Sequence, residues 1–152
     1  MGKTLLAGAC LFSVVLVGCA GPAVQTATYA TLAEARAAGA IDKGWVPADL
    51  PEGVHELRAA YAIDGWERWG LFNFKAADAD ALRAVLDPEE LPLTGTRMEI
   101  PGRIEWWPVI LRGSLDAEHI EATGLRAYRA RAGGLVFGVN WNQGRAYYWA
   151  TR

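Results

Sequence analysis

The sequence predicts an α+β domain in which an antiparallel sheet of about five strands is combined with two or three short helices. Several segments have the alternating pattern of strands and are joined by short turns rich in glycine or asparagine, which is typical of hairpins. These hairpins are not interleaved one by one with helices, which favours an antiparallel sheet with the helices on one face over a parallel sheet. The chain has 152 residues, a length that predicts one domain with one core.

Residues 1–18 have the pattern of a signal peptide. Lys3 provides the positive start, and the apolar run over residues 5–17 is shorter than the roughly 20 residues that a membrane-spanning helix needs. The run ends in Leu16-Val17-Gly18-Cys19, which resembles the lipobox of bacterial lipoproteins. This resemblance implies cleavage after Gly18 and a membrane anchor through lipid, typically a diacylglycerol with palmitate, on Cys19. The alternatives are a secretory peptide that is cut elsewhere and a buried amino-terminal helix.

The residues after the lipobox predict where the anchored protein lies. Residue 20 is alanine and not the aspartate that resembles an inner-membrane retention signal, so in a cell with two membranes we expect the outer membrane, on the side that faces the periplasm. Residues 19–29 contain Gly21 and Pro22 without periodicity and are expected to form a lipidated tether. The globular domain is then expected over residues 30–152.

Cysteine and charge exclude several classes of function. Cys10 leaves with the signal peptide and Cys19 carries the lipid, so the mature domain has no thiol for a disulfide or a cysteine-ligated metal. The net charge is −2, and removal of Lys3 with the leader lowers it to −3. Without a basic patch we expect no nucleic-acid partner, and no motif predicts a cofactor.

The first half of the domain begins with a capped helix and continues into a hairpin. Thr31 and Glu34 form a capping-box pattern that predicts a short helix over residues 31–38. Two prolines in residues 44–51 predict an ordered loop. Residues 54–63 and 66–74 flank Asp64-Gly65 and are expected to pair as strands around a two-residue turn.

The second half is expected to end in three strands. Asp78 can cap a helix that ends before Pro88, irregular chain follows over residues 89–108, and residues 116–122 have a short helical pattern. The three strands that follow are joined by glycine- and asparagine-containing turns, and they are expected over residues 125–132, 135–141 and 146–150.

No catalytic or metal site follows from the titratable residues. The two histidines, His55 and His119, have no metal-ligand spacing, so we expect no metal. A pair of carboxylates could hydrolyse a glycosidic bond, and Asp64 with Glu67 is the candidate pair, while Glu105 could instead act with His119 if the two converge in a cleft. The alternative is that Asp64 forms the turn and both glutamates face solvent.

Seven tryptophans are the most unusual feature, and they either fill the core or make contacts outside the domain. We expect Trp45, Trp69 and Trp149 in the core. If the chain before Pro108 is extended, Trp106 and Trp107 point in opposite directions, with one buried and one at a binding surface. Arg145, after a turn glycine, is a further candidate contact, or the tip of an ordinary hairpin.

The mature chain contains Gly44-Trp45-Val46-Pro47, Leu50-Pro51, the strand over residues 55–64, Trp106-Trp107-Pro108 and the segment over residues 144–149. On these residues it resembles YbbD-head-like domains, a group of small uncharacterised bacterial envelope proteins, over most of residues 30–150. The resemblance implies one envelope domain and assigns no catalytic residue. A non-enzymatic module that binds an envelope protein or a wall component is therefore expected, and a small hydrolase of wall glycan or peptide is the alternative.

Overall fold

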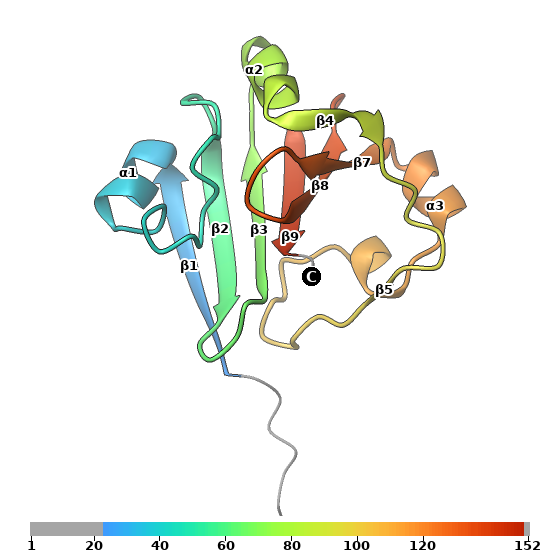
Figure 1. Ribbon diagram of the computed structural model, residues 1–152, viewed down its shortest axis with the longest axis horizontal. Coiled ribbons are helices and arrows are strands. Elements are labelled where there is room, and N and C mark those ends of the chain that lie inside the picture. Colours follow the sequence, from blue (N-terminus) through green and yellow to red (C-terminus); the bar gives the residue numbers. More distant parts are fainter. Residues whose placement is uncertain (1–22, 151–152) are drawn as a thin grey trace, which may run out of the picture.

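Residues 23–150 are described by the structure, a computed structural model, and residues 1–22 and 151–152 lie outside the described part. The predicted signal peptide and Cys19 are among the latter. Seven antiparallel strands form one sheet in the order β1-β2-β3-β9-β8-β7-β4, and β5 pairs with β6 (Figure 1). The strands are β1 Val24–Thr31, β2 His55–Ala62, β3 Arg68–Asn73, β4 Leu86–Glu90, β5 Arg97–Met98, β6 Gly113–Ser114, β7 Leu125–Ala130, β8 Leu135–Asn140 and β9 Arg145–Ala150.

Helices are short and lie between strands. Each α-helix has six residues, and two single 3₁₀ turns accompany them. Among the described residues, no helix has the length and apolar character needed to cross a bilayer. The helical segments are α1 Leu32–Ala37, η1 Ala76–Asp78, α2 Ala79–Ala84, η2 Val109–Leu111 and α3 Ala117–Ala122.

The predicted α+β class is wrong, because the domain is mostly β. The main sheet has seven strands where about five were expected, and a second sheet adds two. The strands that the prediction missed include both edges of the main sheet. β4 contains Pro88 and three acidic residues, a composition that disfavours strand but is tolerated at an edge.

The other missed edge, β1, shortens the predicted tether. Residues 24–29 were assigned to a tether over residues 19–29, but they pair with β2 from Val24 opposite Ala62 onwards. Threonines alternate with small and polar residues in this strand, and only Val24 is fully buried, so the sequence carries no apolar periodicity. Pairing with β2, a long-range interaction, determines its conformation.

Locally encoded features are confirmed. The Thr31 hydroxyl accepts a hydrogen bond from the Glu34 N–H at 3.2 Å and caps α1 as predicted, while the Glu34 carboxylate accepts one from the N–H of Ala30, the residue before the cap, at 2.8 Å. The three carboxyl-terminal strands also form where they were expected. The β2–β3 hairpin is confirmed, but its turn comprises residues 63–67 and is longer than the two-residue turn that Asp64-Gly65 predicted.

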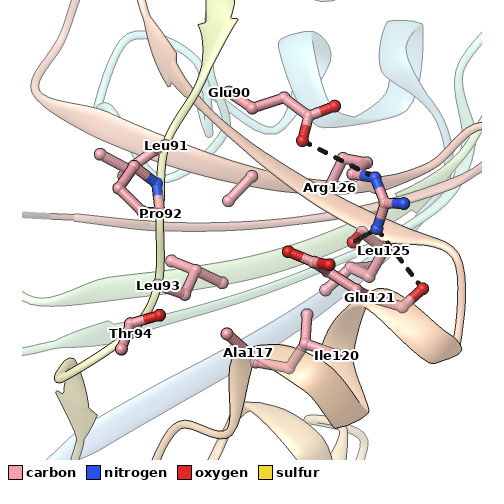
Figure 2. Close-up of a pocket in the computed structure, with 11 residues that line it drawn as sticks. Glu90, Leu91, Pro92, Leu93, Thr94, Ala117, Ile120, Glu121, Leu125 and Arg126 are labelled. Carbon is pink, nitrogen blue, oxygen red and sulfur yellow. Dashed lines mark hydrogen bonds and ion pairs between the residues drawn. The ribbon is translucent and has the colours of Figure 1, made fainter.

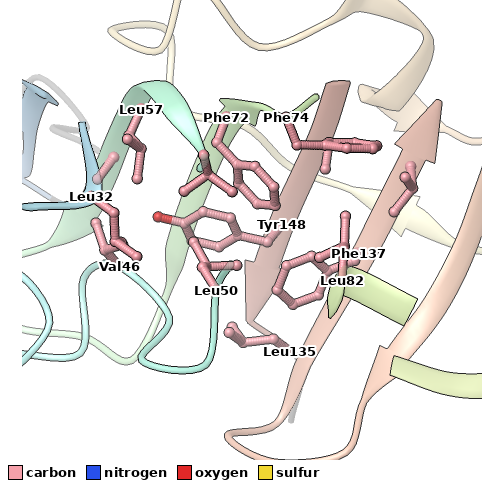
Figure 3. Packing of buried hydrophobic residues seen from close by; sticks show 14 of the residues in the cluster. Leu32, Val46, Leu50, Leu57, Phe72, Phe74, Leu82, Leu135, Phe137 and Tyr148 are labelled. Carbon is pink, nitrogen blue, oxygen red and sulfur yellow. The ribbon is translucent and has the colours of Figure 1, made fainter. Parts of the chain in front are cut away.

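Each face of the sheet carries its own core. The first core contains Phe72, Phe137 and Tyr148, covered by α1, α2 and the chain between α1 and β2 (Figure 3). The second contains Trp69 and Trp149, covered by residues 91–124, which include α3. The expectation that all helices lie on one face is therefore wrong. All six residues of β8 are buried because both of its faces are covered.

One close approach positions Tyr148 in the first core. Gly70 on β3 lies opposite Tyr148 on β9, and a Cβ atom at Gly70 would lie 1.9 Å from the Tyr148 ring. The phenol lies over Gly70 on the face of the first core and donates a hydrogen bond to the Trp45 carbonyl at 2.8 Å. Burial raises the pKa of the Tyr148 phenol far above its ordinary value. Tyr148 therefore stays a neutral hydrogen-bond donor that ties the loop before β2 to the centre of the sheet.

Candidate functional site

Trp107 lies in the second core. Its side chain is 1% exposed, and its indole Nε1 donates a hydrogen bond to the Leu111 carbonyl at 2.9 Å. Its ring meets those of Tyr147 and Trp149 edge to face, with centroids 5.7 and 6.1 Å away. A side chain buried in this way cannot contact a partner, so Trp107 is not a binding residue in this conformation.

Trp106 is partly buried and packs against the second core. The expectation that the two indoles point in opposite directions is wrong, since the rings contact each other with centroids 6.1 Å apart. The chain turns here instead of extending, as shown by the hydrogen bond from the Trp107 N–H to the Ile104 carbonyl at 3.2 Å. A contact between Trp106 and a partner stays a prediction.

Arg145 is exposed at the start of β9 and bonds to neighbouring strands. Its Nε donates to the Asn73 side-chain oxygen at 2.9 Å, and the Asn73 amide donates to the Glu56 carboxylate. Glu56 lies in an irregular part of β2, with a φ of 51°. The three side chains link β9, β3 and β2, and a binding role for Arg145 stays a prediction.

The titratable pairs do not form a shared site. His119 pairs with Asp116, with 2.8 Å between Nδ1 and Oδ2, and Asp116 also caps α3. Hydrogen bonding from the His119 side chain is the main reason why the pKa of the Asp116 carboxyl is lowered. Glu105 is exposed. Glu67 lines a small cavity beside Trp45, and Asp64 is not among the residues that line it.

The remaining histidine also has a local partner. The Nδ1 atom of His55 lies 3.2 Å from the Gly53 carbonyl oxygen, so its contact is with the loop before β2. Over residues 23–150, no three His, Cys, Asp or Glu side chains gather in a way that could hold a metal ion.

An open cavity between β4, β7 and α3 offers a better candidate site (Figure 2). We call it the α3 cavity. Its volume is about 180 Å³, and its walls come from three separate parts of the chain. Figure 2 shows the segment after β4 on one side and α3 with the start of β7 on the other. The apolar lining consists of Leu91, Pro92, Leu93, Ala117, Ile120, Leu125 and Ala127.

Charged side chains of both signs surround the α3 cavity. The Arg126 Nε lies 3.7 Å from the Glu90 carboxylate, and an Arg126 Nη1 donates to the Glu121 carbonyl at 3.4 Å. The Glu121 side chain also lines the cavity (Figure 2). Two carboxylates and one guanidinium give this rim a net charge of −1. The Glu90–Arg126 pair is long and partly exposed, so an incoming ligand can replace it at little cost.

A second cavity lies beside the first and shares Glu90 with it. Its volume is about 260 Å³, and Tyr128, Trp141 and Arg83 line it. The Arg83 guanidinium lies 3.7 Å above the Trp141 ring, and the Trp141 Nε1 donates to the Tyr128 hydroxyl at 3.1 Å. In the ladder between β4 and β7, Leu86 pairs with Ala130 and Glu90 with Tyr128, and the register shifts between these pairs.

Sequence reasoning missed both cavities because their walls are distant in the chain. The sequence predicts irregular chain over residues 89–108 and only a short helix over residues 116–122. Only the signal of Leu91-Pro92-Leu93, an apolar run without helix or strand pattern, could have suggested an apolar wall. The pairing of β4 with β7 brings that run opposite α3.

Comparison with known proteins identifies one similar family. Residues 24–73, which contain β1, α1, β2 and β3, match the family model for the YbbD head domain. No curated protein and no solved structure shows a significant match. The match supports the resemblance for this part of the chain and is shorter than the expected range of residues 30–150. The first three strands of the sheet, with α1, are therefore similar to a YbbD head domain.

Proposed function

We propose that this protein is an envelope lipoprotein, anchored through lipid on Cys19, that works by binding a peptide in the α3 cavity. The lipobox at residues 16–19 supports the anchor. The similarity to the YbbD head domain supports an envelope-associated, non-catalytic domain. An outer-membrane position facing the periplasm follows from Ala20, as argued from the sequence.

The observation that carries the binding proposal is the combination of an apolar lining and a charged rim. A volume of about 180 Å³ is smaller than the roughly 300–1,000 Å³ of typical small-molecule pockets, so it suits a single side chain. The rim, with Glu90, Glu121 and Arg126, offers acceptors and a donor for backbone amides. An apolar side chain next to a positive group fits both the lining and the net negative rim.

Peptides of this chemistry have two sources in the envelope, namely a partner protein and the peptide stems of the wall. Photo-cross-linking distinguishes them. A photoreactive amino acid in place of Thr94, which is exposed and lines the cavity, should cross-link to a discrete protein if the source is a partner. Isolated wall sacculi should sediment the full-length protein if the source is the wall.

Reversal of one rim charge gives the matched test. Glu121→Lys changes the net charge of the rim from −1 to +1. In whichever assay detects binding, cross-linking or sedimentation, the substitution should lower binding about tenfold, because the positive rim repels the positive group of the ligand. Glu118→Lys, on the same exposed helix but outside the cavity, should leave binding unchanged.

Three results would count against the proposal. Equal effects of the two substitutions, or neither cross-linking nor sedimentation, would exclude the α3 cavity as a peptide site. Release of soluble fragments from the sacculi would instead favour a hydrolase. In that case Glu90→Gln and Glu121→Gln should each abolish the release, because these two rim carboxylates would be the catalytic pair.

A further inference from the structure

Exposed apolar side chains gather in the turn between β2 and β3. Within the described residues, three large hydrophobic side chains are exposed, and two of them, Ile63 at 50% and Trp66 at 39%, lie in this five-residue turn. The third is Val109, at 82%, on η2. Single exposed apolar residues are common on proteins, but two in one short turn point to a contact.

The turn is bonded to the point where the chain enters the domain. The Ile63 N–H donates to the Ala23 carbonyl at 2.9 Å, and Ala62 pairs with Val24 at the start of β1. Figure 1 shows the β2–β3 turn and the start of β1 at the same lower end of the sheet, while α2 lies at the upper end.

The anchor cannot lie far from this turn. Cys19 precedes Ala23 by four residues, and four residues span at most about 14 Å when fully extended. The polar layer on each side of a bilayer is about 5–7 Å thick. The β2–β3 turn is therefore held within reach of the headgroups of the membrane that carries the lipid.

The surface next to the turn has the side chains that favour a bilayer interface. A cavity of about 220 Å³ beside it is lined by Lys43, Trp45, Tyr61 and Trp66, among others. The Trp45 and Tyr61 rings are stacked with centroids 3.8 Å apart, and the Lys43 Nζ lies 4.4 Å from the Trp45 centroid. Tryptophan and tyrosine are enriched at headgroup depth, and lysine can extend its ammonium group towards phosphate.

Net charge does not attract this surface to a bilayer. Lys43 and Arg68 are balanced by Asp64 and Glu67, so the turn and its cavity carry no net charge. Contact with a bilayer would therefore depend on the burial of apolar and aromatic side chains and would be insensitive to salt.

We propose that the β2–β3 turn is a bilayer contact site, in which Ile63 and Trp66 enter the headgroup layer of the membrane that holds the anchor. This inference rests on the proposed lipid at Cys19 and adds an orientation to it. The β2–β3 end of the sheet faces the membrane, and the end with α2 faces away from it.

Fluorescence of a single label tests the contact. The mature acylated protein is placed in vesicles of phosphatidylethanolamine and phosphatidylglycerol, with an environment-sensitive fluorophore on Ile63→Cys or, as the matched control, on Val109→Cys. Brominated lipids should quench the label at position 63 at least about threefold more than the label at position 109, because interfacial side chains are buried about 5–10 Å deep. Trp66→Ser should reduce quenching at position 63, and about 1 M salt should not.

The possible results distinguish a failure of the lipid anchor from a failure of the bilayer contact. If mass spectrometry of the same sample shows no lipid on Cys19, the anchor is wrong and the orientation is wrong with it. If Cys19 is acylated and the label at position 63 is quenched no more than the label at position 109, the anchor stands and the bilayer contact is overturned. Loss of quenching in salt would show a charge-driven contact and would also contradict the proposal.

Discussion

Replacement of Trp107 by alanine is expected to lower the free energy of unfolding by about 3–5 kcal/mol, the usual cost of removing a large aromatic side chain from a core. The indole is 1% exposed, meets three other aromatic rings and donates a hydrogen bond to Leu111. The substitution removes this packing and leaves the Leu111 carbonyl without its buried donor. Chemical denaturation of the full-length protein measures the loss.

Trp106→Ala is the matched control, because the two indoles are neighbours and differ in burial. Trp106 is only partly buried, so its replacement should cost about 1 kcal/mol or less. Losses of similar, large size for both substitutions would show that Trp106 is a core residue, and the last candidate contact of this segment would then be gone.

Gly70→Ala is expected to destabilise the protein by about 1–3 kcal/mol or more, as overpacking of a core does. The added methyl would lie 1.9 Å from the Tyr148 ring, and this ring is held by burial and by its hydrogen bond to Trp45. Gly102→Ala is the control, since a methyl there would meet no atom within 4 Å. Thermal denaturation should show a large loss for the first substitution and almost none for the second.

A double-mutant cycle with Tyr148→Ala tests the cause. If the methyl at position 70 acts only through the phenol ring, the two substitutions together should cost clearly less than the sum of their separate effects. Additive losses would mean that strain at Gly70 arises from the backbone and not from the approach of Tyr148.

The elements that the sequence predicted correctly are those with local signals. Thr31 and Glu34 lie three residues apart and form their cap within one turn of helix. The β2–β3 hairpin and the three last strands are likewise recognisable from turn residues and from segments next to them. Long-range pairing carries no such signal. β9 lies beside β3, more than seventy residues earlier in the chain, and this pairing joins the two halves of the sheet.

The difference between local and long-range signals also explains which parts of the candidate sites the sequence predicts. The sequence predicts correctly for only some of the tryptophans whether they lie in the core. Trp69 and Trp149 are buried as expected, whereas Trp45 is partly buried and stacks on Tyr61. The α3 cavity depends on the pairing of β4 with β7. The sequence does not predict this pairing, because Pro88 disfavours a strand at that position. The β2–β3 turn lies beside the start of β1 because residues 24–29 form a strand and not a tether.

Lipid on Cys19 is proposed to hold the protein at a membrane. The mass of the mature protein, isolated from membranes of cells that produce the full chain, tests it directly. We expect a chain that begins at Cys19 and carries a diacylglycerol, and Cys19→Ser should release the protein from the membrane fraction. A mature chain that begins at another residue, or one in which Cys19 carries no lipid, would contradict the account.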